Sequence, residues 1–254
     1  MADSMTIGTV EIGRDREVAV ITLHRGRKLN ALSAHMETEL LRALRSPAVT
    51  SSRAVVVTGG DRVFSAGADV TELREMATQD IVDYYRGSGS VYEEFAALPQ
   101  PTVAAITGYC LGGGLELALA ADIRIADPAA VFGFPEIDIG ILPSSGGVTR
   151  IARAVGAGRA RDLVLRGRRF DARQAEQWGV VTEIAAAGDH VNHAIAVAHE
   201  LTAHSPLALR ITKQVLNVSL DAPREATLLL EQLAYSVLND ASALSDSPSA
   251  NPAV

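Results

Sequence analysis

The stretch Gly108-Tyr-Cys-Leu-Gly112-Gly113-Gly114-Leu-Glu116 decides how the rest of the chain can be arranged. It follows the apolar segment 101–107, which is typical of a short buried strand, and its glycines prevent that strand from continuing. Residues 115–121 are good helix formers without a breaker, so they are predicted to form a helix. The glycines then lie at a helix N-terminus, where free backbone N–H groups can bind an anion.

The same glycines would let a ligand approach the main chain closely, because they carry no Cβ atom. A carbonyl oxygen that gains negative charge in a transition state needs such backbone donors. Glu116 falls in the first turn of the predicted helix, and a second carboxylate, Glu136, follows Phe134-Pro135. Asp127-Pro128 and Phe134-Pro135 interrupt any helix between the two glutamates, so they can meet only if the chain folds back.

Composition indicates one domain with an appendage. The chain has 254 residues, of which 48% are hydrophobic, which is enough to bury one sizeable core. The net charge is −7, and the basic residues are nearly all scattered arginines, so nucleic acid is not an expected partner. A single cysteine, Cys110, excludes an internal disulfide. Without a secretory segment or a long apolar run, neither a membrane nor export is expected, and the predicted location is the cytoplasm.

The N-terminal residues predict the order strand, strand, helix, strand. Alternating residues at 6–12 and an apolar run at 18–23 favour a hairpin with a charged turn at residues 14–16. Ser33 is placed to cap a helix that runs to about Arg45. Residues 53–58 form a β-branched run, which is typical of a strand covered on both faces.

A second glycine-bearing loop, residues 59–69, follows that strand and precedes a predicted helix at about 79–97. A strand, a glycine loop and a helix therefore occur twice in the chain. Ligands in α/β proteins bind at the carboxyl ends of strands. Residues 59–69 and 108–114 are accordingly expected to form two walls of one site.

The C-terminal third is predicted to be mostly helical. Besides a short strand at 180–184, helices are expected over residues 156–166, 171–177, 189–203, 206–218 and 223–239. The expected division is a core with the site at 1–190, a helical region at 191–240 and a disordered tail at 241–254. The tail is rich in Ser, Ala, Asp and Pro and lacks periodicity.

Five short motifs carry a family resemblance that covers roughly residues 6–240. They are Asn30-Ala-Leu32, Phe64-Ser-Ala-Gly-Ala68-Asp69, Gly108–Glu116, Phe132-Gly-Phe-Pro-Glu136 and Pro143-Ser-Ser-Gly-Gly147. Together they resemble the crotonase (enoyl-CoA hydratase/isomerase) superfamily. The resemblance implies an α/β fold, a spiral of ββα turns with a C-terminal helical region that assembles trimers or pairs of trimers. It implies an acyl-coenzyme A thioester as substrate, so that coenzyme A arrives with the substrate and no separate cofactor or metal is expected.

The resemblance also implies roles for individual residues. The backbone N–H groups of Ala68 and Gly113 would form an oxyanion hole for the thioester carbonyl, worth several kcal/mol per donor. Residues matching Glu116 and Glu136 flank the C2–C3 double bond in hydratases, where one deprotonates water and the other supplies a proton to C2. Asp69 fits a helix cap as well as a substrate contact. The implied contacts to the substrate and coenzyme A are Arg27, Lys28, Ala66, Asp69 and Val70.

The predicted reaction is enoyl-CoA hydration, the syn addition of water to the C2–C3 double bond of a 2-enoyl-CoA thioester. Double-bond isomerisation within the superfamily is the alternative, and serines at 144 and 145, where hydratases commonly have glycine, leave the fit of water open. A non-catalytic acyl-CoA binder is a further alternative. Residues 107–114 also match the phosphate loop of short-chain dehydrogenases, but no tyrosine has a lysine four residues on.

Overall fold

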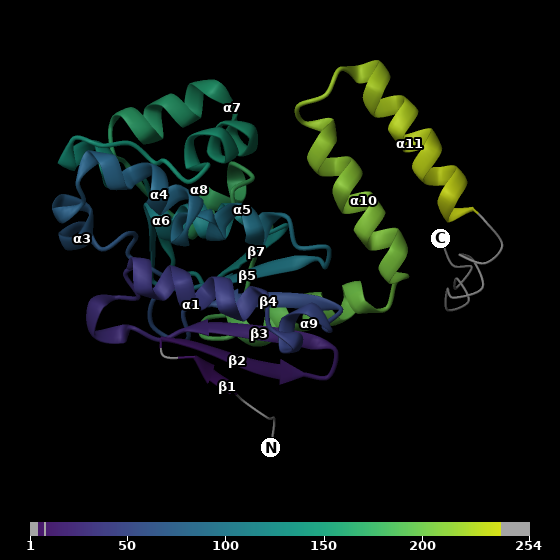
Figure 1. Ribbon diagram of the computed structural model, residues 1–254, viewed down its shortest axis with the longest axis horizontal. Helices are drawn as coiled ribbons and strands as arrows, with labels where there is room; N and C mark the ends of the chain where they lie inside the picture. Colours follow the sequence, from purple (N-terminus) through teal and green to yellow (C-terminus); the bar gives the residue numbers. More distant parts are fainter. Residues whose placement is uncertain (1–4, 8, 240–254) are drawn as a thin grey trace.

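A computed structural model describes residues 5–7 and 9–239 and has two β-sheets surrounded by helices (Figure 1). The larger sheet has antiparallel pairing from β1 to β3 and parallel pairing from β3 onward. In spatial order its strands are β1 (Met5–Ile7), β2 (Val10–Asp15), β3 (Val18–Leu23), β4 (Ala54–Thr58), β5 (Thr102–Ile106), β7 (Ile123–Ala126) and β10 (Glu183–Ile184). The smaller sheet contains β6 (Tyr109–Leu111), β8 (Val131–Gly133) and β9 (Arg169–Asp171).

The predicted N-terminal order is confirmed, with a shift in the first turn. β2 and β3 form the expected hairpin, and β4 is buried along its whole length, as its β-branched composition indicates. The strand predicted at 6–12 is instead divided between β1 and β2. β2 continues to Asp15, so the hairpin turn falls at Arg16, which has a φ of 52°.

Helix α1 (Ala34–Leu44) begins where the sequence predicts, because Ser33 accepts a hydrogen bond from the Met36 N–H at 3.2 Å. A short helix α2 (Pro47–Thr50) leads into β4. Helix α3 (Val70–Glu75) is capped by Asp69, which accepts from the Thr71 N–H at 3.2 Å. The predicted cap at Asp69 is therefore confirmed.

The single helix predicted at 79–97 is wrong in its continuity. The segment consists of η2 (Thr78–Asp80), α4 (Ile81–Arg86), η3 (Ser88–Ser90) and α5 (Val91–Ala96). Gly87 has φ −94° and ψ −116°, which no helix accommodates, and glycine loses more entropy in a helix than other residues do. The break at Gly87 separates α4 from the segment that contains η3 and α5.

The glycine run turns the chain sharply between the two sheets. Gly108, with φ +55°, separates β5 from β6, and helix α6 (Gly113–Ala120) begins two residues earlier than predicted. Gly112 has φ +49°, and a Cβ placed on it would lie 2.8 Å from Oε1 of Glu136. Glu136 itself lies in η4 (Pro135–Ile139). Glycine at 112 thus provides both the backbone conformation and the room for the second glutamate.

The C-terminal third is helical, as predicted. Its helices are α7 (Gly147–Leu165), α8 (Ala172–Gln177), α9 (His190–Thr202), α10 (Pro206–Ser219) and α11 (Arg224–Leu238). Helix α7 starts before the predicted helix at 156–166 because two helical stretches join across a kink at Gly156, and the strand predicted at 180–184 is reduced to β10.

Helix α9 packs Ala194 and Ala198 against the larger sheet, whereas α10 and α11 form a hairpin that projects from the main body (Figure 1). The division into 1–190 and 191–240 stays a prediction, and the tail at 241–254 lies outside the described residues. Within residues 5–7 and 9–239, no helix has the length and apolar content needed to cross a membrane.

Candidate active site

The two glycine loops lie side by side, as the sequence predicts. The Ser65 N–H donates to the Tyr109 carbonyl at 2.9 Å, and the Leu111 N–H donates back to the Ser65 carbonyl at 3.0 Å. A Cβ on Gly108 would come within 2.2 Å of the Arg62 carbonyl oxygen. The close approach of the two loops therefore requires glycine at that position.

The backbone N–H of Ala68 has no hydrogen-bond acceptor in the described residues, unlike the N–H groups of its neighbours. The three N–H groups around it are all occupied: those of Ala66, Gly67 and Asp69 donate to Leu29 O, Ser65 Oγ and Leu32 O, at 2.9, 3.1 and 2.8 Å. A buried backbone donor is normally paired, so a single free one in a tightly bonded loop indicates a place for a ligand atom.

A second backbone donor without an acceptor lies close to Ala68, at the start of α6. The Gly112 N–H donates to Gly133 O, but the Gly113 N–H, at the first residue of α6, has no acceptor among residues 5–7 and 9–239. A Cβ on Gly113 would lie 3.4 Å from the Ala68 nitrogen. The structure thus brings together the two N–H groups that the sequence predicts for an oxyanion hole. Both lie near the N-terminus of α6, where the helix dipole favours negative charge.

Glu116 is buried in the first turn of α6, three residues after Gly113, with 4% of its surface exposed. Its Oε1 accepts hydrogen bonds from the Ser145 N–H at 2.7 Å and the Gly147 N–H at 2.9 Å. Burial raises the pKa of this carboxyl, while the two N–H groups and the charge of Arg150 act in the opposite direction. Bonds from two backbone donors fix the carboxyl and favour its ionised form.

Glu136 is the second carboxyl at the site. Burial raises its pKa to about 7, a hydrogen bond from its own backbone lowers it, and the charge of Glu116 raises it further. Its Oε2 is buried and has no partner in the described part of the protein. The sequence predicts an upward pKa shift from the apolar flanks of Glu136, and the direction is confirmed. A carboxyl with this pKa can hold or release a proton near neutral pH.

An apolar cavity of about 260 Å³ adjoins the donors and Glu136. It is lined by Ala68 and Gly113 from the donor loops and by apolar side chains of α3, of the end of η4 and of the residues just after it, namely Val70, Leu73, Ile139 and Ile141. Two of the predicted substrate contacts, Ala66 and Val70, belong to this lining. The cavity therefore joins the polar groups of the site to an apolar wall, as binding sites for small molecules commonly do.

The remaining predicted contacts, Arg27, Lys28 and Asp69, do not line this cavity. Arg27 and Lys28 are exposed in η1 (Gly26–Lys28), just before Leu29, whose carbonyl accepts the Ala66 N–H. Asp69 is engaged by Arg25 at 2.8 Å, and this ion pair lowers the pKa of the carboxyl. Asp69 accordingly has a structural role at the start of α3, and its contact with substrate stays a prediction.

A third buried carboxyl, Glu37 on α1, is a feature that the motifs do not reveal. It accepts hydrogen bonds from the hydroxyls of Tyr84 at 2.9 Å and Tyr92 at 3.0 Å. Burial raises its pKa to about 7 despite these bonds. The sequence does indicate that Glu37 is buried. Its helical spacing places it on the same face of α1 as Leu40, Leu41 and Leu44, and that face is buried.

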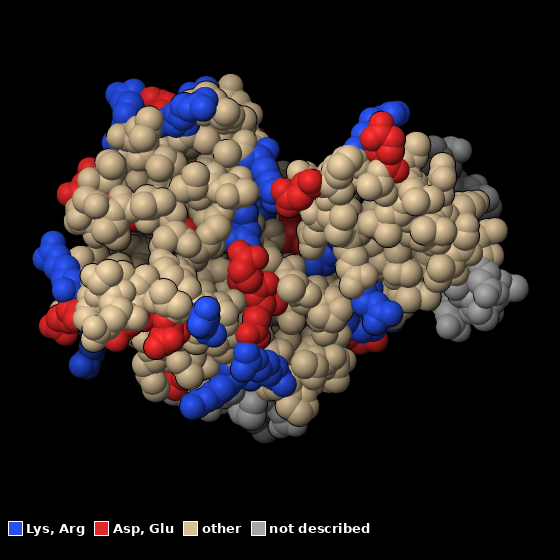
Figure 2. Space-filling view, turned by 45° about the horizontal axis from the view of Figure 1, so that its top comes forward, with Lys and Arg blue, Asp and Glu red and all other residues tan. Residues whose placement is uncertain are grey.

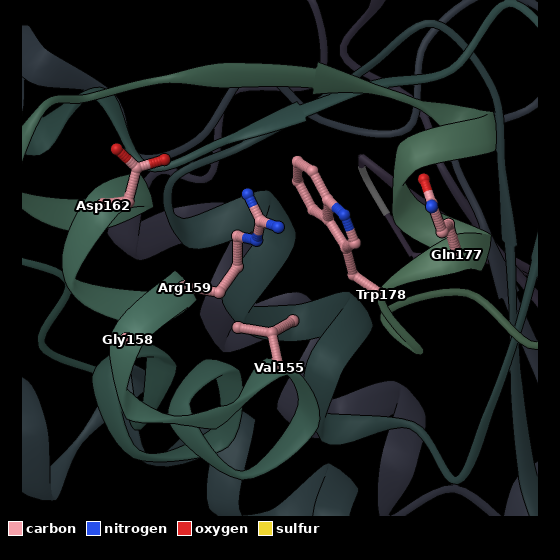
Figure 3. Close-up of a pocket in the computed structure, with 6 residues that line it drawn as sticks. All are labelled: Val155, Gly158, Arg159, Asp162, Gln177 and Trp178. Carbon is pink, nitrogen blue, oxygen red and sulfur yellow. The ribbon is translucent and has the colours of Figure 1, made fainter.

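Another cavity, of about 490 Å³, lies between α7 and α8 and has no connection to these groups (Figure 3). Its lining is Val155, Gly158, Arg159, Asp162, Gln177 and Trp178. The Arg159 guanidinium carbon is 4.3 Å from the centre of the Trp178 ring, and Figure 3 shows the two side chains facing each other. None of the predicted site residues lines this cavity.

Two neighbouring backbone donors without acceptors in the described chain, two buried glutamates and this α/β fold are the features of an enzyme of the crotonase superfamily. The sequence profile described as "Enoyl-CoA hydratase/isomerase" matches residues 13–247. The chain belongs to this family. Membership excludes the short-chain dehydrogenase alternative, since residues 107–114 follow β5 in a crotonase site.

Relatives cover nearly the whole chain. A probable enoyl-CoA hydratase from Mycobacterium bovis is 37% identical over 234 residues, which are 90% of this chain and 88% of the relative. A short-chain-enoyl-CoA hydratase from Clostridium acetobutylicum is 33% identical and covers 91% of this chain and 89% of its own. The crystal structure of an enoyl-CoA hydratase from Thermoplasma volcanium superposes with a TM-score of 0.86 at 32% identity, covering 93% of this chain and 95% of that one.

Proposed function

We propose that the protein is an enoyl-CoA hydratase that adds water in the syn sense to the C2–C3 double bond of a 2-enoyl-CoA thioester. The observation that carries this proposal is that Glu136 lines one cavity with Ala68 and Gly113, while a second buried carboxyl, Glu116, lies in the first turn of the helix that Gly113 begins. Hydration of a conjugated thioester needs a base for water, an acid for C2 and donors for the enolate oxygen. The site has a candidate for each.

In the proposed mechanism, the thioester oxygen accepts hydrogen bonds from Ala68 and Gly113, which stabilise the negative charge that develops there. Glu116, ionised and fixed by its two backbone donors, orients a water molecule and removes its proton as the oxygen attacks C3. Burial raises the pKa of Glu136 to about 7, so a substantial fraction of the molecules have this carboxyl protonated at neutral pH, and it then delivers its proton to C2. The mechanism therefore assigns opposite starting protonation states to the two carboxyls.

Double-bond isomerisation is the second candidate, and the state of Glu136 is what favours it. A single carboxyl with a pKa of about 7 and an unpartnered Oε2 can take a proton from one carbon and return it to another. In that reaction Glu116 would have no essential role. Two glutamates held at one site support hydration more directly than they support isomerisation.

The test is to incubate the protein with 2-enoyl-CoA and 3-enoyl-CoA thioesters and to follow the products by mass spectrometry. We expect 2-enoyl-CoA to gain the mass of one water. An isobaric conversion of 3-enoyl-CoA without any hydration would establish the isomerase instead. Binding of the thioesters without conversion would overturn both reactions and leave the acyl-CoA binder.

The proposed coenzyme A site extends from the donor loop to η1. Arg27 and Lys28 are exposed cations on a chain with a net charge of −7, so they provide the local positive charge that a polyanionic nucleotide needs. Ala66 and Val70 would contact the part of the substrate next to the thioester. Asp69 would act there mainly by holding α3 in place.

We also propose that the protein assembles as a trimer or a pair of trimers through α10 and α11. Large apolar side chains are exposed on this hairpin, among them Leu216 at 61% and Leu229 at 57%, and a cavity of about 660 Å³ lies between its helices. Figure 2 shows the hairpin as a separate lobe with a mostly uncharged face. Such a surface is typical of an interface.

Sedimentation velocity at micromolar concentration is expected to show a trimer or a hexamer. The charged variant Leu229→Glu should shift the distribution towards monomer, because it places a charge on the exposed apolar face. Lys213 anchors α10 to the main body through Asp122 at 2.8 Å and would be left intact. A wild-type protein that sediments only as monomer would contradict the assembly.

A further inference from the structure

The loop that holds Glu116 is itself held by an arginine of α7. Glu116 receives its two hydrogen bonds from the N–H groups of Ser145 and Gly147. The backbone between these two donors carries the Ser145 carbonyl, and Nη1 of Arg150 donates to that oxygen at 2.9 Å. Nη2 of the same arginine donates to Oε1 of Glu93 on α5 at 2.6 Å. One guanidinium thus joins the loop to a second helix.

Two glycines of this loop leave room for the carboxyl and for the guanidinium. A Cβ on Gly147 would lie 2.7 Å from Oε1 of Glu116. A Cβ on Gly146 would overlap the guanidinium of Arg150, and Gly146 also has φ +90°, a conformation that favours glycine. Each of the two charged groups occupies the place that a side chain of the loop would otherwise take. The loop is therefore packed directly against both of them.

Folding stability alone does not account for an arginine at position 150. Arg150 is the fourth residue of α7 and lies near the end of the helix where the dipole favours an anion. Its carboxylate partner, Glu93, is 73% exposed, whereas the Arg150 side chain is only 16% exposed. An ion pair with one partner largely in water contributes little to the free energy of folding. A cation in this unfavourable place points to a role at the loop that it holds.

The charge of Arg150 also acts on Glu116. Burial raises the pKa of Glu116, whereas the N–H groups of Gly147 and Ser145 and the charge of Arg150 lower it. The other titratable groups around this carboxyl and its loop come from four elements. They are Glu136 of η4, Tyr84 of α4, Tyr92 and Glu93 of α5 and, bonded to both tyrosines, Glu37 of α1. Arg150 is the only cation among these groups.

We propose that Arg150 is a positioning residue for Glu116, because it fixes the backbone of residues 145–147 that orients the carboxyl and supplies the positive charge that keeps the carboxyl ionised. The inference rests on the proposed function, in which Glu116 is the base. Oε2 of Glu116 has no hydrogen-bond partner within the described residues, so it is the oxygen left for the water. A displacement of about 1 Å at a reacting group can cost roughly 10²-fold in rate. Arg150 therefore acts on kcat more than on substrate affinity.

The variant Arg150→Met removes both hydrogen bonds and the charge but keeps an unbranched side chain. We expect kcat for hydration to fall by about 10- to 100-fold with a smaller change in KM, because the base is no longer fixed. The acidic loss of kcat/KM should move to higher pH, since Glu116 must be ionised and the lost cation no longer lowers its pKa. Arg150→Lys keeps the charge and a donor for the Ser145 carbonyl, so it should recover most of both effects.

Two further variants separate positioning from a general loss of structure. Glu93→Gln keeps an acceptor for Arg150 but removes a negative charge, so the acidic loss should stay in place or move to lower pH. General loosening of the loop would instead move it to higher pH, as in Arg150→Met. Glu93 is exposed, so this variant tests the proposal even if Arg150→Met does not fold. Arg153→Met is the matched control, because this arginine of α7 pairs with Asp221 and should keep the wild-type kcat and pH profile.

Direct titration of Glu116 keeps this proposal separate from the proposed reaction. In protein labelled with ¹³C at the glutamate carboxyls, the NMR signal that Glu116→Gln lacks belongs to Glu116, and its shift follows ionisation without any turnover. The midpoint is expected at higher pH in Arg150→Met than in wild type. An unchanged midpoint in folded Arg150→Met would overturn the role of Arg150, even if the wild type hydrates enoyl-CoA. If the midpoint rises but no enoyl-CoA is hydrated, that role is supported and the hydratase is contradicted.

Discussion

Replacement of Glu136 by glutamine is expected to lower kcat for hydration by about 10²- to 10⁴-fold, the range that a general acid contributes. Glutamine keeps the shape of the side chain but has no proton to deliver to C2 at neutral pH. Glu116→Gln should cause a loss of similar size because it removes the base. KM should change less than kcat, since both carboxyls act on the reacting atoms. Steady-state kinetics on the best 2-enoyl-CoA substrate would measure both constants.

The double variant distinguishes a catalytic pair from two independent contributions. Groups that act as a unit give losses far below the product of the single effects, so the double variant should be only slightly slower than either single one. If Glu136→Gln is inactive on 3-enoyl-CoA while Glu116→Gln stays mild, the chemistry is isomerisation. Near-native rates in both single variants would show that the two-glutamate mechanism is wrong.

The pH dependence of kcat/KM tests the same assignment of Glu116 as base and Glu136 as acid. Burial raises the pKa of Glu136 to about 7, and the proposed mechanism needs this carboxyl protonated, so kcat/KM for hydration should fall as the pH rises through about 7. Glu116 must be ionised, so a second loss should occur on the acidic side. In Glu136→Gln the alkaline loss should disappear from the residual activity. A wild-type rate that rises steadily through pH 7 and above would contradict these protonation states.

Local sequence was sufficient to predict the turn into the helix N-terminus, whereas the pairing of the Ala68 and Gly113 N–H groups was predicted from the resemblance to the crotonase superfamily. Glycines at 112 and 113 directly before good helix formers predict a sharp turn into a helix N-terminus, and the structure brings the Gly113 N–H beside Ala68. The upward pKa shift of Glu136 also followed from its apolar flanks, because burial acts on the charged form in a known direction. Each inference depended on neighbours within a few residues.

The remaining features depend on contacts between distant residues, which spacing alone does not determine. Glu37 lies on a helical face that is otherwise apolar, and only the fold shows that Tyr84 and Tyr92 come from beyond position 80 to bind it. The helix predicted at 79–97 was wrong for a related reason. Its good helix formers outweighed Gly87 in the pattern, whereas Gly87 adopts non-helical backbone angles and divides the segment into separate short helices.

Gly113→Pro is expected to abolish turnover while the protein still folds and binds coenzyme A. Proline has no N–H, so the variant removes one of the two donors to the thioester oxygen, which no side-chain change can do. Because Gly113 is the first residue of α6, its N–H has no role inside the helix, and proline is well tolerated there. Loss of one such donor costs about 10²- to 10³-fold in kcat, and crowding by the ring should deepen the effect.

The steric crowding in Gly113→Pro comes in part from the Tyr92 hydroxyl, and a second variant can remove that contact. A Cβ at position 113 would lie 3.1 Å from the Tyr92 hydroxyl, so Gly113→Pro should also be made in a Tyr92→Phe background, where that oxygen is absent. Gly158→Ala is a control for adding a side chain, because nothing lies within 4 Å of its Cβ position. Turnover should stay normal in Gly158→Ala and Tyr92→Phe should remain active, while both proline variants should be inactive. A folded proline variant that binds coenzyme A and hydrates at the wild-type rate would remove Gly113 from the oxyanion hole.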